Sequence, residues 1–381
     1  MKAMGRRWCC GSAPAKSRGG GSSAFELYYN AETVLMNPCY RVGITGDMYD
    51  KIMATDSARQ ALEDAAGVEV VRFDHGDGPV APAEIDVFDA LMAGGVRIAR
   101  ESTIGLKRLS LIVRFGAGFD RVDLDGCTEA GVVVATTPAG IRRAMSTAAM
   151  AHMLALATRY LFKRQCLYDG RWQEAAAAEH MGIGLAGRAL GYVGFGNIGQ
   201  DLYKLAQPFE MRHLVYDPYL SDEVAGQHDI ERVDFGDLLD QADFIVLLCL
   251  LTDETRHLIN EAALKRMKNT AYLINVARGA IIDQAALARA LAAGEIGGCG
   301  LDAYDPEPIA PDDPLLELDN ANLTPHALGY TDEMIRLCSE LCVKATLDIR
   351  RGEVPDSVIN RKVLEGAVLK GKLAGYRATN G

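Results

Sequence analysis

The sequence predicts an α/β protein with two doubly wound units, the second of which is inserted into the first. Three observations support this prediction. From about Tyr40, apolar runs of strand length alternate with helical stretches, as in parallel sheets covered by helices on both faces. A second series of such runs starts at Ala189, after a long apolar helix expected from Ser146 to about Gln165. A helical run between Leu328 and Arg350 could return to the first unit and would make that unit discontinuous.

The expected strands of the first unit are apolar runs, with a polar helix between the first two. They are Tyr40–Thr45, Val68–Phe73, Leu109–Arg114 and Gly131–Ala135. The second unit has six β-rich runs: Ala189–Val193, His213–Tyr216, Phe244–Leu250, Ala271–Val276, Cys299–Asp302 and Asn322–Thr324. Helices are expected between these runs, for example over Ile198–Ala206, Ala262–Met267 and Gln284–Ala293. Six strands with helical crossovers are the size of a complete dinucleotide-binding domain.

Composition excludes several classes of protein. The 381 residues are 49% hydrophobic and 24% charged, which is enough apolar material for real cores and excludes a mainly disordered chain or a coiled coil. A formal net charge of -11 repels phosphate backbones, so no nucleic-acid partner is expected. The longest apolar runs, such as Phe244–Leu251, are far shorter than the ~20 residues that cross a bilayer, so no membrane partner is expected.

The nine cysteines are scattered and contain no C-x-x-C pair, which argues against a disulfide framework and against a metal site. Cys338 and Cys342 are expected to be two buried small residues on a helix. We therefore expect a cytoplasmic protein. Met1–Ala24 is basic and free of acids, which is also compatible with an organelle transit peptide, but a disordered tail over residues 1–38 is the favoured interpretation. Residues 366–381 are expected to form a second loose tail.

A glycine-rich loop predicts the cofactor site. Gly194, Gly196 and Gly199 form G-x-G-x-x-G between an expected strand and an expected helix. The first glycine allows a tight turn, the second lets a pyrophosphate approach the backbone, and the third lets the helix pack closely on the strand. The amides of Asn197 and Ile198 would open the helix and face the phosphates.

The residue expected to bind the cofactor ribose is Asp217. It ends the next expected strand, at about the 20-residue spacing that the motif requires. A carboxylate there accepts hydrogen bonds from the ribose hydroxyls and repels a 2′-phosphate, which favours NAD over NADP. The alternative is a glycine turn that only packs a helix, followed by a solvated aspartate.

Four side chains that could carry chemistry follow expected strands of the second unit. They are Arg278, Asp302, Glu307 and His326. The carboxyl ends of parallel strands are where ligands bind in open α/β sheets. The alternatives are a solvated surface arginine, a structural histidine and an acidic turn around Glu307.

These segments resemble the D-isomer-specific 2-hydroxyacid dehydrogenase family over about residues 40–365. The motifs that carry the resemblance are the glycine loop, N-x-A-R-G at Asn275–Gly279, L-D-x-x-x-x-E-P at Leu301–Pro308, and T-P-H at Thr324–His326. The resemblance implies a Rossmann NAD-binding domain over residues 147–328, inserted in a discontinuous flavodoxin-like substrate domain formed by residues 39–146 and 329–365. It also implies a homodimer.

The resemblance implies specific roles for the site residues. Arg278, Glu307 and His326 fall on the family's catalytic triad. Asp302 either supports the site residues from behind or lies near the nicotinamide carboxamide, and Val276 and Ala277 contact the cofactor. The chemistry agrees with these roles. A planar guanidinium can hold the carboxylate and ketone of a 2-keto acid. An imidazole can supply or accept the proton that hydride transfer requires near neutral pH. A carboxylate can orient that imidazole and favour its charged form.

The segment Arg114–Asp120 follows a strand of the first unit and matches the family's substrate loop. Backbone amides at Gly116, Ala117 and Gly118 could approach a substrate carboxylate. Arg114 could reach a substrate tail or could pair with a neighbouring acid. Leu248, Cys249 and Leu250 stand where family members often carry a histidine and a proline, so this part of the cofactor contact differs from the family pattern.

The sequence therefore predicts an NAD-dependent oxidoreductase that interconverts a small 2-keto acid and a D-2-hydroxy acid by hydride transfer. Two alternatives stay open. One is a short-form D-3-phosphoglycerate dehydrogenase, since no regulatory domain is expected after residue 365. The other is a non-catalytic NAD-sensing protein of the corepressor type, which the fold alone does not exclude.

Overall fold

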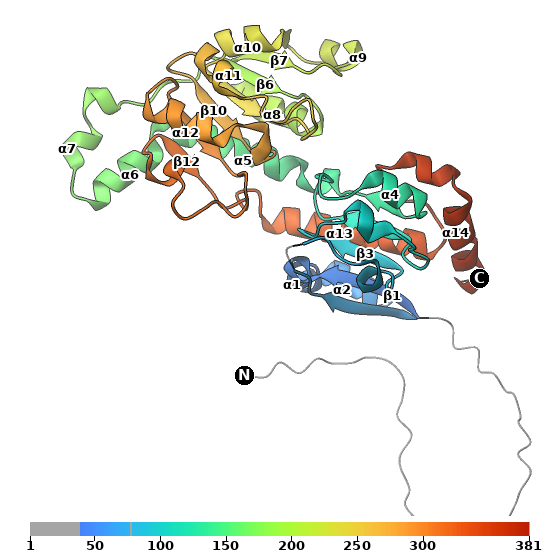
Figure 1. The fold of residues 1–381 in the computed structure, drawn as a ribbon. Coiled ribbons are helices and arrows are strands. Elements are labelled where there is room, and N and C mark those ends of the chain that lie inside the picture. The colour runs from blue at the N-terminus through green and yellow to red at the C-terminus, as the bar shows by residue number, and fades with distance from the viewer. Residues whose placement is uncertain (1–38, 77, 381) are drawn as a thin grey trace, which may run out of the picture. The chain divides into compact units, whose positions relative to one another are not determined.

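The structure is a computed structural model that describes residues 39–76 and 78–380. The tail expected over residues 1–38 lies outside the described residues. The chain divides into two compact units (Figure 1). Unit 1 contains the described residues up to Phe115, then Arg121–Thr136, and the chain from Ser339 onward, whereas unit 2 contains Gly116–Asp120 and Thr137–Cys338. The division falls at Thr137 and Ser339, about ten residues away from the boundaries expected at 146 and 329.

Unit 1 is built on a five-stranded parallel sheet with the order β2-β1-β3-β4-β5. The strands are β1 (Tyr40–Thr45), β2 (Val68–Phe73), β3 (Ala90–Ala93), β4 (Leu111–Arg114) and β5 (Val133–Ala135). The sequence interpretation missed β3, which lies at the centre of this sheet and is fully buried. Its four residues, Ala-Leu-Met-Ala, are good helix formers, so burial between two neighbouring strands decides their conformation.

Helices cover both faces of this sheet. They are α1 (Gly46–Ala54), α2 (Asp56–Glu63), α3 (Pro82–Ile85), α4 (Leu124–Glu129), α13 (Asp332–Arg350) and α14 (Ala367–Asn380), with 3₁₀ turns at Arg100–Thr103 and Arg361–Glu365. One hydrophobic cluster joins α1, α2, α13 and α14 to the sheet, and a second cluster joins α3 and α4 to the opposite face. Because α13 belongs to unit 1 from Ser339 onward, the chain returns to this unit, as the sequence predicts.

The expectation of a loose tail over residues 366–381 is wrong for the described part of this segment. Helix α14 places Leu369 and Leu373 in the core of unit 1, and the ring of its Tyr376 lies 5.4 Å from the ring of Tyr40. Gly371 and Gly375 lower the helix propensity of this segment and conceal its apolar spacing. Burial of the apolar face compensates for this weak propensity.

Unit 2 is built on a seven-stranded parallel sheet with the order β12-β11-β10-β9-β6-β7-β8. Six of its strands are the six that the sequence predicts: β6 (Ala189–Val193), β7 (Arg212–Tyr216), β9 (Phe244–Leu247), β10 (Tyr272–Asn275), β11 (Gly298–Leu301) and β12 (Ala321–Leu323). The seventh, β8 (Glu231–Arg232), has only two exposed residues and carries no apolar signal. The strand order reverses between β6 and β9, which is the switch point of a doubly wound sheet.

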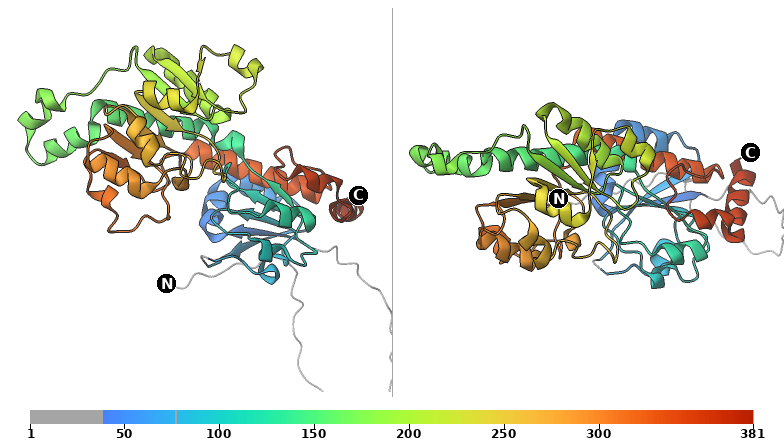
Figure 2. Two further views of the ribbon diagram at one scale, coloured as in Figure 1. Left: turned by 45° about the horizontal axis from the view of Figure 1, so that its top comes forward. Right: turned by 90° about the horizontal axis from the view of Figure 1, so that it is seen from above.

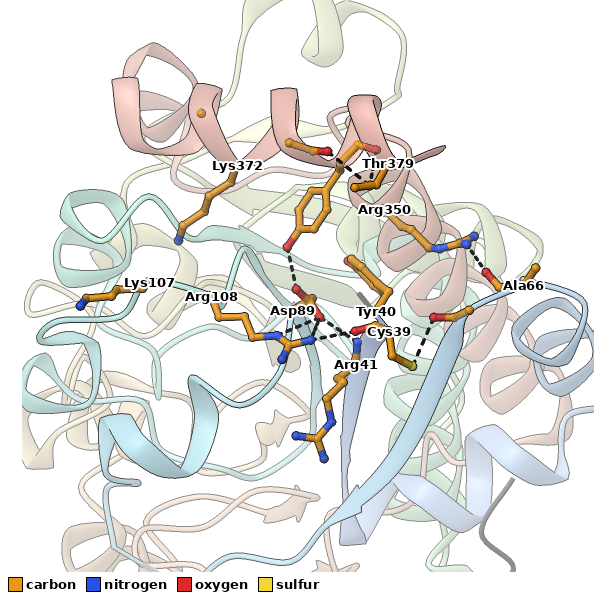
Figure 3. A pocket seen from close by; sticks show the side chains of 14 residues that line it. Cys39, Tyr40, Arg41, Ala66, Asp89, Lys107, Arg108, Arg350, Lys372 and Thr379 are labelled. Carbon is orange, nitrogen blue, oxygen red and sulfur yellow. Dashed lines mark hydrogen bonds and ion pairs between the residues drawn. The ribbon is translucent and has the colours of Figure 1, made fainter. Parts of the chain in front are cut away.

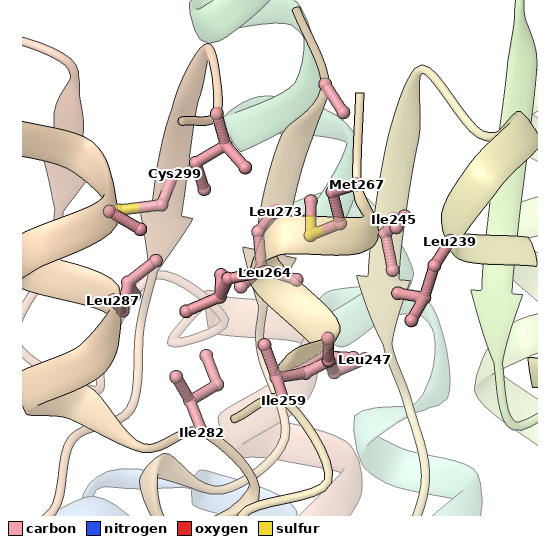
Figure 4. Packing of buried hydrophobic residues seen from close by; sticks show 14 of the residues in the cluster. Leu239, Ile245, Leu247, Ile259, Leu264, Met267, Leu273, Ile282, Leu287 and Cys299 are labelled. Atoms are coloured by element: carbon pink, nitrogen blue, oxygen red, sulfur yellow. The ribbon is translucent and has the colours of Figure 1, made fainter. Parts of the chain in front are cut away.

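The helices of unit 2 connect these strands on both faces of the sheet. They are α8 (Asn197–Ala206), α9 (Asp222–Gly226), α10 (Phe235–Gln241), α11 (Glu261–Arg266) and α12 (Gln284–Ala292), with 3₁₀ turns at Ala178–His180, Gln207–Phe209, Gly279–Ile281 and Pro314–Glu317. Figure 4 shows the core under α10, α11 and α12, where Leu239, Leu264 and Leu287 pack with Ile245 and Leu273 of the sheet. This rigid core positions the loops at the carboxyl ends of the strands.

The single long helix expected from Ser146 to Gln165 is wrong in its extent. The chain forms α5 (Pro138–Thr158) and then α6 (Tyr160–Tyr168), because Arg159 adopts a left-handed conformation with φ 54°. Such a conformation ends a helix. Helices α6 and α7 (Trp172–Ala175) extend away from the sheet of unit 2 as an arm (Figure 2).

Two further observations concern membranes and metals. Within the described ranges, no helix is both long and apolar enough to span a membrane. The same ranges contain no group of three or more histidine, cysteine and acidic side chains arranged to hold a metal ion. Cys338 and Cys342 are both fully buried on α13, which confirms the sequence interpretation of this pair.

Candidate active site

The glycine loop joins β6 to α8 at the switch point of unit 2. Gly194 has φ +95°, and a Cβ there would lie 2.9 Å from the backbone nitrogen of Cys249, so this position requires glycine. A Cβ on Gly199 would lie 2.9 Å from the carbonyl oxygen of Gly194, which shows how closely the helix approaches the loop. A Cβ on Gly196 would meet nothing within 4 Å. The loop therefore leaves open space at its centre, and Asn197 and Ile198 form the first turn of α8.

Asp217 lies directly after β7, beside the glycine loop. Its Oδ2 accepts a hydrogen bond of 2.8 Å from the amide of Phe195, and its Oδ1 accepts one of 2.9 Å from the amide of Tyr219. The carboxylate is thus held at the loop by two backbone amides. This is the position that a dinucleotide-binding fold uses for the ribose.

The imidazole of His326 is paired with the carboxylate of Glu307. Nδ1 of His326 lies 2.8 Å from Oε1 and 3.0 Å from Oε2 of Glu307, and Oε1 also accepts the amide of Tyr304 at 2.9 Å. Burial alone would raise the pKa of Glu307. Three influences outweigh burial and hold this pKa below its usual value: the hydrogen bond and charge of His326, the hydrogen bond from the Tyr304 amide, and the charge of Arg278. Glu307 therefore stays ionised, and Nε2 of His326 remains for proton exchange.

The loop that carries His326 is tied down by Asp302. This aspartate is buried, and its carboxylate accepts hydrogen bonds from the Thr324 hydroxyl at 2.7 Å and from the amides of Ala327 and Leu328 at 3.1 and 3.2 Å. His326 itself has φ +51°, a conformation that non-glycine residues rarely adopt. Asp302 thus holds the side chain of Thr324 before this strained position and the backbone of Ala327 and Leu328 after it, which fixes the direction of the imidazole.

His152 of α5 lies behind this loop. Its Nε2 is 3.4 Å from Oγ1 of Thr324, and a Cβ on Gly300 would lie 2.7 Å from its Cβ. Burial lowers the pKa of His152 to about 4, despite the opposing charge of Asp302. His152 is therefore neutral at neutral pH.

This lowered pKa predicts a pH-dependent stability. Between about pH 6.5 and pH 4 the unfolded chain binds a proton at His152 that the folded chain does not bind, so the free energy of unfolding falls as the pH falls through this window. The expected loss is about 3 kcal/mol. His152→Gln should reduce this loss, measured by urea unfolding at pH 7 and pH 4.5. Equal losses in both proteins would show that His152 is not the group responsible.

Arg278 follows β10 and is held by two oxygens. Its Nε donates to Oδ1 of Asp120 at 2.9 Å, and its Nη1 donates to the carbonyl oxygen of Ala277 at 2.9 Å. The side chain of Asn275 braces this turn, since Nδ2 donates to the carbonyl of Arg278 at 2.8 Å and Oδ1 accepts the amide of Ala277 at 2.9 Å. The guanidinium is thus fixed in direction, and its charge reaches Glu307.

Comparison with known proteins identifies the family. The family model for the D-isomer-specific 2-hydroxyacid dehydrogenase NAD-binding domain matches residues 150–327. The glyoxylate reductase of Pyrococcus horikoshii is 36% identical over 314 residues, which cover 80% of this chain and 92% of that protein. The chain belongs to the D-isomer-specific 2-hydroxyacid dehydrogenase family. It is accordingly an oxidoreductase, and its cofactor is NAD.

Other members of the family are similar over much of this 2-hydroxyacid dehydrogenase. The D-3-phosphoglycerate dehydrogenase of Methanocaldococcus jannaschii is 35% identical over 75% of this chain, which spans 54% of that protein. Among solved structures, the glyoxylate reductase from Paecilomyes thermophila has a TM-score of 0.74 at 26% identity and covers 85% of this chain and 99% of its own. The D-lactate dehydrogenase from Aquifex aeolicus complexed with NAD and lactic acid has a TM-score of 0.73 at 26% identity. The match covers 84% of this chain and 99% of that protein.

The residues expected to bind substrate fall in both units of this dehydrogenase. Arg114 ends β4 in unit 1, is buried, and donates to the carbonyl of Gly94. Gly116, Ala117 and Gly118 belong to the segment assigned to unit 2. Gly116 has φ +114° and donates its amide to Oγ1 of Thr137 at 2.7 Å. A side chain at Gly118 would collide with the guanidinium of Arg278, so this glycine leaves room for the arginine.

The sequence interpretation missed three contributions to this site. Asp120 orients Arg278, His152 supports the loop of His326, and the amide of Tyr304 fixes Glu307. Asp120 is separated from Arg278 by more than 150 residues, and His152 from Thr324 by more than 170. No local pattern links residues so far apart, so only the fold pairs them. The one local signal is the spacing from Tyr304 to Glu307.

Proposed function

We propose that this dehydrogenase reduces a small 2-keto acid to a D-2-hydroxy acid, or catalyses the reverse reaction, with His326 as the acid and base. The pairing of His326 Nδ1 with the ionised Glu307 is the observation that carries the proposal. This pairing leaves Nε2 to give a proton to the ketone oxygen or to accept one from the hydroxyl. Glu307 stabilises the imidazolium that the reduction consumes.

The carboxylate and ketone of the substrate are assigned to Arg278. Its guanidinium is planar, permanently charged and already fixed by Asp120, so little conformational freedom is lost when it binds a carboxylate. Of the expected substrate-binding amides, that of Gly116 is engaged by the hydroxyl of Thr137, so the amides of Ala117 and Gly118 are proposed to contact the substrate. Arg114 is proposed to act near the substrate as well. We assign unit 1 as the substrate domain and unit 2 as the cofactor domain.

The residues of unit 2 fit NAD. The open space at Gly196, the first turn of α8 and the carboxylate of Asp217 are the parts that a dinucleotide requires, and Val276, Ala277 and Asp302 are assigned to the nicotinamide side. When bound, the reduced cofactor supplies the hydride for the ketone carbon. The chain itself orients the substrate and transfers the proton.

The cofactor assignment predicts the effect of Asp217→Ala. Loss of the ribose hydrogen bonds should weaken NADH binding by about 10- to 100-fold, because hydrogen bonds to a charged group contribute about 1.5–3 kcal/mol. The repulsion of a 2′-phosphate disappears at the same time, so the preference for NADH over NADPH should narrow. Titration of both cofactors by fluorescence measures the two dissociation constants. An unchanged preference would contradict the role of Asp217.

The substrate is addressed by one panel experiment. NADH oxidation is measured with glyoxylate, hydroxypyruvate, pyruvate, phenylpyruvate and phosphohydroxypyruvate. The similarity to glyoxylate reductases favours turnover of the small acids. A clear preference for phosphohydroxypyruvate would instead support a phosphoglycerate dehydrogenase. This activity is the second candidate because the chain is also similar to a D-3-phosphoglycerate dehydrogenase. Tight NADH binding without any turnover would support a non-catalytic sensor.

We propose a homodimer whose interface includes the arm formed by α6, α7 and the turn after them. Five large apolar side chains of this arm are more than half exposed: Tyr160, Leu167, Tyr168, Trp172 and Met181. Large exposed apolar groups gathered on one short segment are typical of interaction surfaces, and a second copy of the chain can cover them with its own arm. Covering this surface is the physical reason for association.

The dimer proposal predicts that Tyr168→Glu combined with Trp172→Glu yields a monomer. Their side chains are 69% and 67% exposed, so the folded chain should tolerate both charges, whereas a buried interface should not. Light scattering after gel filtration measures the mass. Leu316→Glu is the control, since Leu316 is also exposed and lies outside the arm. A monomeric wild type, or a double variant that stays dimeric, would contradict the proposal.

A reducing, cytoplasmic compartment is proposed for the protein. The cysteines in the described part of the chain are all free thiols, and most of them are buried. Proteins of oxidising compartments more often use such residues in disulfides.

A further inference from the structure

Unit 1 contains a cavity of about 630 Å³ at the amino ends of its parallel strands (Figure 3). Its walls come from the start of β1, the residues just before β2, β3 and β4, the end of α13 and one side of α14. In open parallel sheets, ligands of the main site bind at the opposite, carboxyl ends of the strands. The cavity is therefore separate from the substrate loop that follows β4.

The lining of this cavity is strongly basic, although the chain as a whole carries a net charge of -11. Five of the lining side chains are basic and one is a carboxylate: Arg41, Lys107, Arg108, Arg350, Lys372 and Asp89. Figure 3 shows Arg108 beside Asp89, whereas the charged ends of Lys107 and Arg41 point away from this pair. Two of the basic groups are already neutralised, because Arg108 pairs with Asp89 at 2.6 Å and Arg41 pairs with Glu69 at 3.0 Å. Asp89 also accepts the hydroxyl of Tyr376 at 3.1 Å, so its oxygens are engaged.

Positive charge remains after these pairs are formed. The ammonium of Lys372 donates to the carbonyl oxygens of Leu109, Ala130 and Gly131 at 2.6, 3.1 and 3.4 Å. The charge of Asp86 acts on it, but within the described residues no carboxylate forms a direct ion pair with it. Burial lowers the pKa of Lys372 to about 8. Lys107 is exposed at the rim, and its ammonium has no hydrogen-bond or ion-pair partner within the described ranges. Lys372 is half-buried, and a half-buried cation without a directly paired acid is costly unless an anion accompanies it.

Helix α14 keeps the cavity open. It lines the cavity with Gly371 and Gly375, and a Cβ at either position would meet nothing within 4 Å. Each glycine inside a helix costs roughly 0.5–1 kcal/mol relative to alanine. Alanine would fit sterically at both positions, so packing within unit 1 gives no reason for the glycines. An open surface next to Lys372 and Tyr376 is what they provide.

We propose that this cavity of unit 1 binds a small phosphorylated metabolite, with the phosphate group between Lys372 and Lys107. Lysine and arginine side chains are the usual ligands of phosphate. The volume lies within the range of about 300–1,000 Å³ that is typical of small-molecule sites, which exceeds the needs of a free phosphate ion. The remaining space along Gly371, Gly375 and the ring of Tyr376 receives the organic part of the ligand.

The proposal is tested by titration calorimetry on the full chain saturated with NADH, so that the cofactor site is occupied. Glycerol 3-phosphate and inorganic phosphate are the two probes, and glycerol at the same ionic strength is the blank. We expect glycerol 3-phosphate to bind with a sub-millimolar dissociation constant and more tightly than inorganic phosphate. Equal binding of both probes would show a site for the free ion and would overturn the metabolite assignment.

Three variants locate the binding. Lys372→Gln and Lys107→Gln should each weaken it by about tenfold or more, since each removes a charge-assisted contact. Gly375→Leu keeps every cation and fills the cavity, so it should abolish binding. Lys370→Gln is the matched control, because Lys370 is an exposed lysine of α14 that donates to the carbonyl of Glu365 and does not line the cavity.

Thermal unfolding checks that each variant is folded. If Lys372→Gln does not fold, the variants Lys107→Gln and Gly375→Leu still show whether the probe binds in this cavity. No binding of either probe to the wild type, or binding unchanged in both Lys107→Gln and Gly375→Leu, would overturn the proposal. Because the readout is binding and not turnover, a negative result here is independent of whether the keto-acid chemistry is correct.

Discussion

His326→Ala is expected to lower kcat for keto-acid reduction by about 10²–10⁴-fold, the usual contribution of a positioned acid or base. The variant removes the imidazole whose Nδ1 is bound by Glu307, and with it the proton for the developing alkoxide. NADH binding should be unchanged, because the glycine loop and Asp217 are untouched. The measurements are steady-state kinetics of NADH oxidation and a fluorescence titration of NADH.

Two companion variants make this prediction specific. Glu307→Gln keeps the shape of the side chain and removes its charge, so activity should also fall, because the imidazolium that donates the proton loses its counter-charge. His75→Ala, which changes a histidine of unit 1, serves as the control and should retain wild-type turnover. If His326→Ala keeps full activity, the acid and base must be another group and the proposed mechanism is wrong.

Arg278→Gln is expected to lower kcat/KM by about 10²–10⁴-fold. Two hydrogen bonds to a charged substrate group contribute roughly 1.5–3 kcal/mol each, and every 1.36 kcal/mol corresponds to a factor of ten. Glutamine retains neither the charge nor the planar fork that Asp120 holds in place. The decrease should appear in KM and kcat together, because the guanidinium is assigned both to the carboxylate and to the ketone.

The variant Arg278→Lys separates the effect of the positive charge on activity from the effect of the guanidinium geometry. It preserves the positive charge and should recover only a small part of the lost activity, because an ammonium lacks the two parallel donors of the fork. Arg289→Gln is the matched control, since Arg289 is a 64% exposed arginine of the same unit. A variant Arg278→Gln with an unchanged KM for the keto acid would exclude this side chain as the carboxylate ligand.

Much of the fold and of the site can be predicted from sequence, and the successes share a physical cause. The six strands expected in unit 2 are present, because most of them are short apolar runs that the parallel sheet buries, such as β6, β9 and β11. The glycine loop and Asp217 follow consecutive strands at fixed spacings. The failures are β3, α14 and the break at Arg159, where tertiary packing or a single left-handed residue overrides local propensity.

The sequence by itself determined the chemistry of the side chains and the local structures that carry them. These local structures are the turn at Gly194, the strand ends before Arg278 and His326, and the dinucleotide-binding pattern. Only the tertiary structure decided which groups hold these local structures in place. Asp120 meets Arg278, Asp302 anchors the loop of His326, and α14 opens a basic cavity in unit 1. The physical reason is that turns and strands depend on neighbours along the chain, whereas buried charges are paired by groups that only folding brings within hydrogen-bond distance.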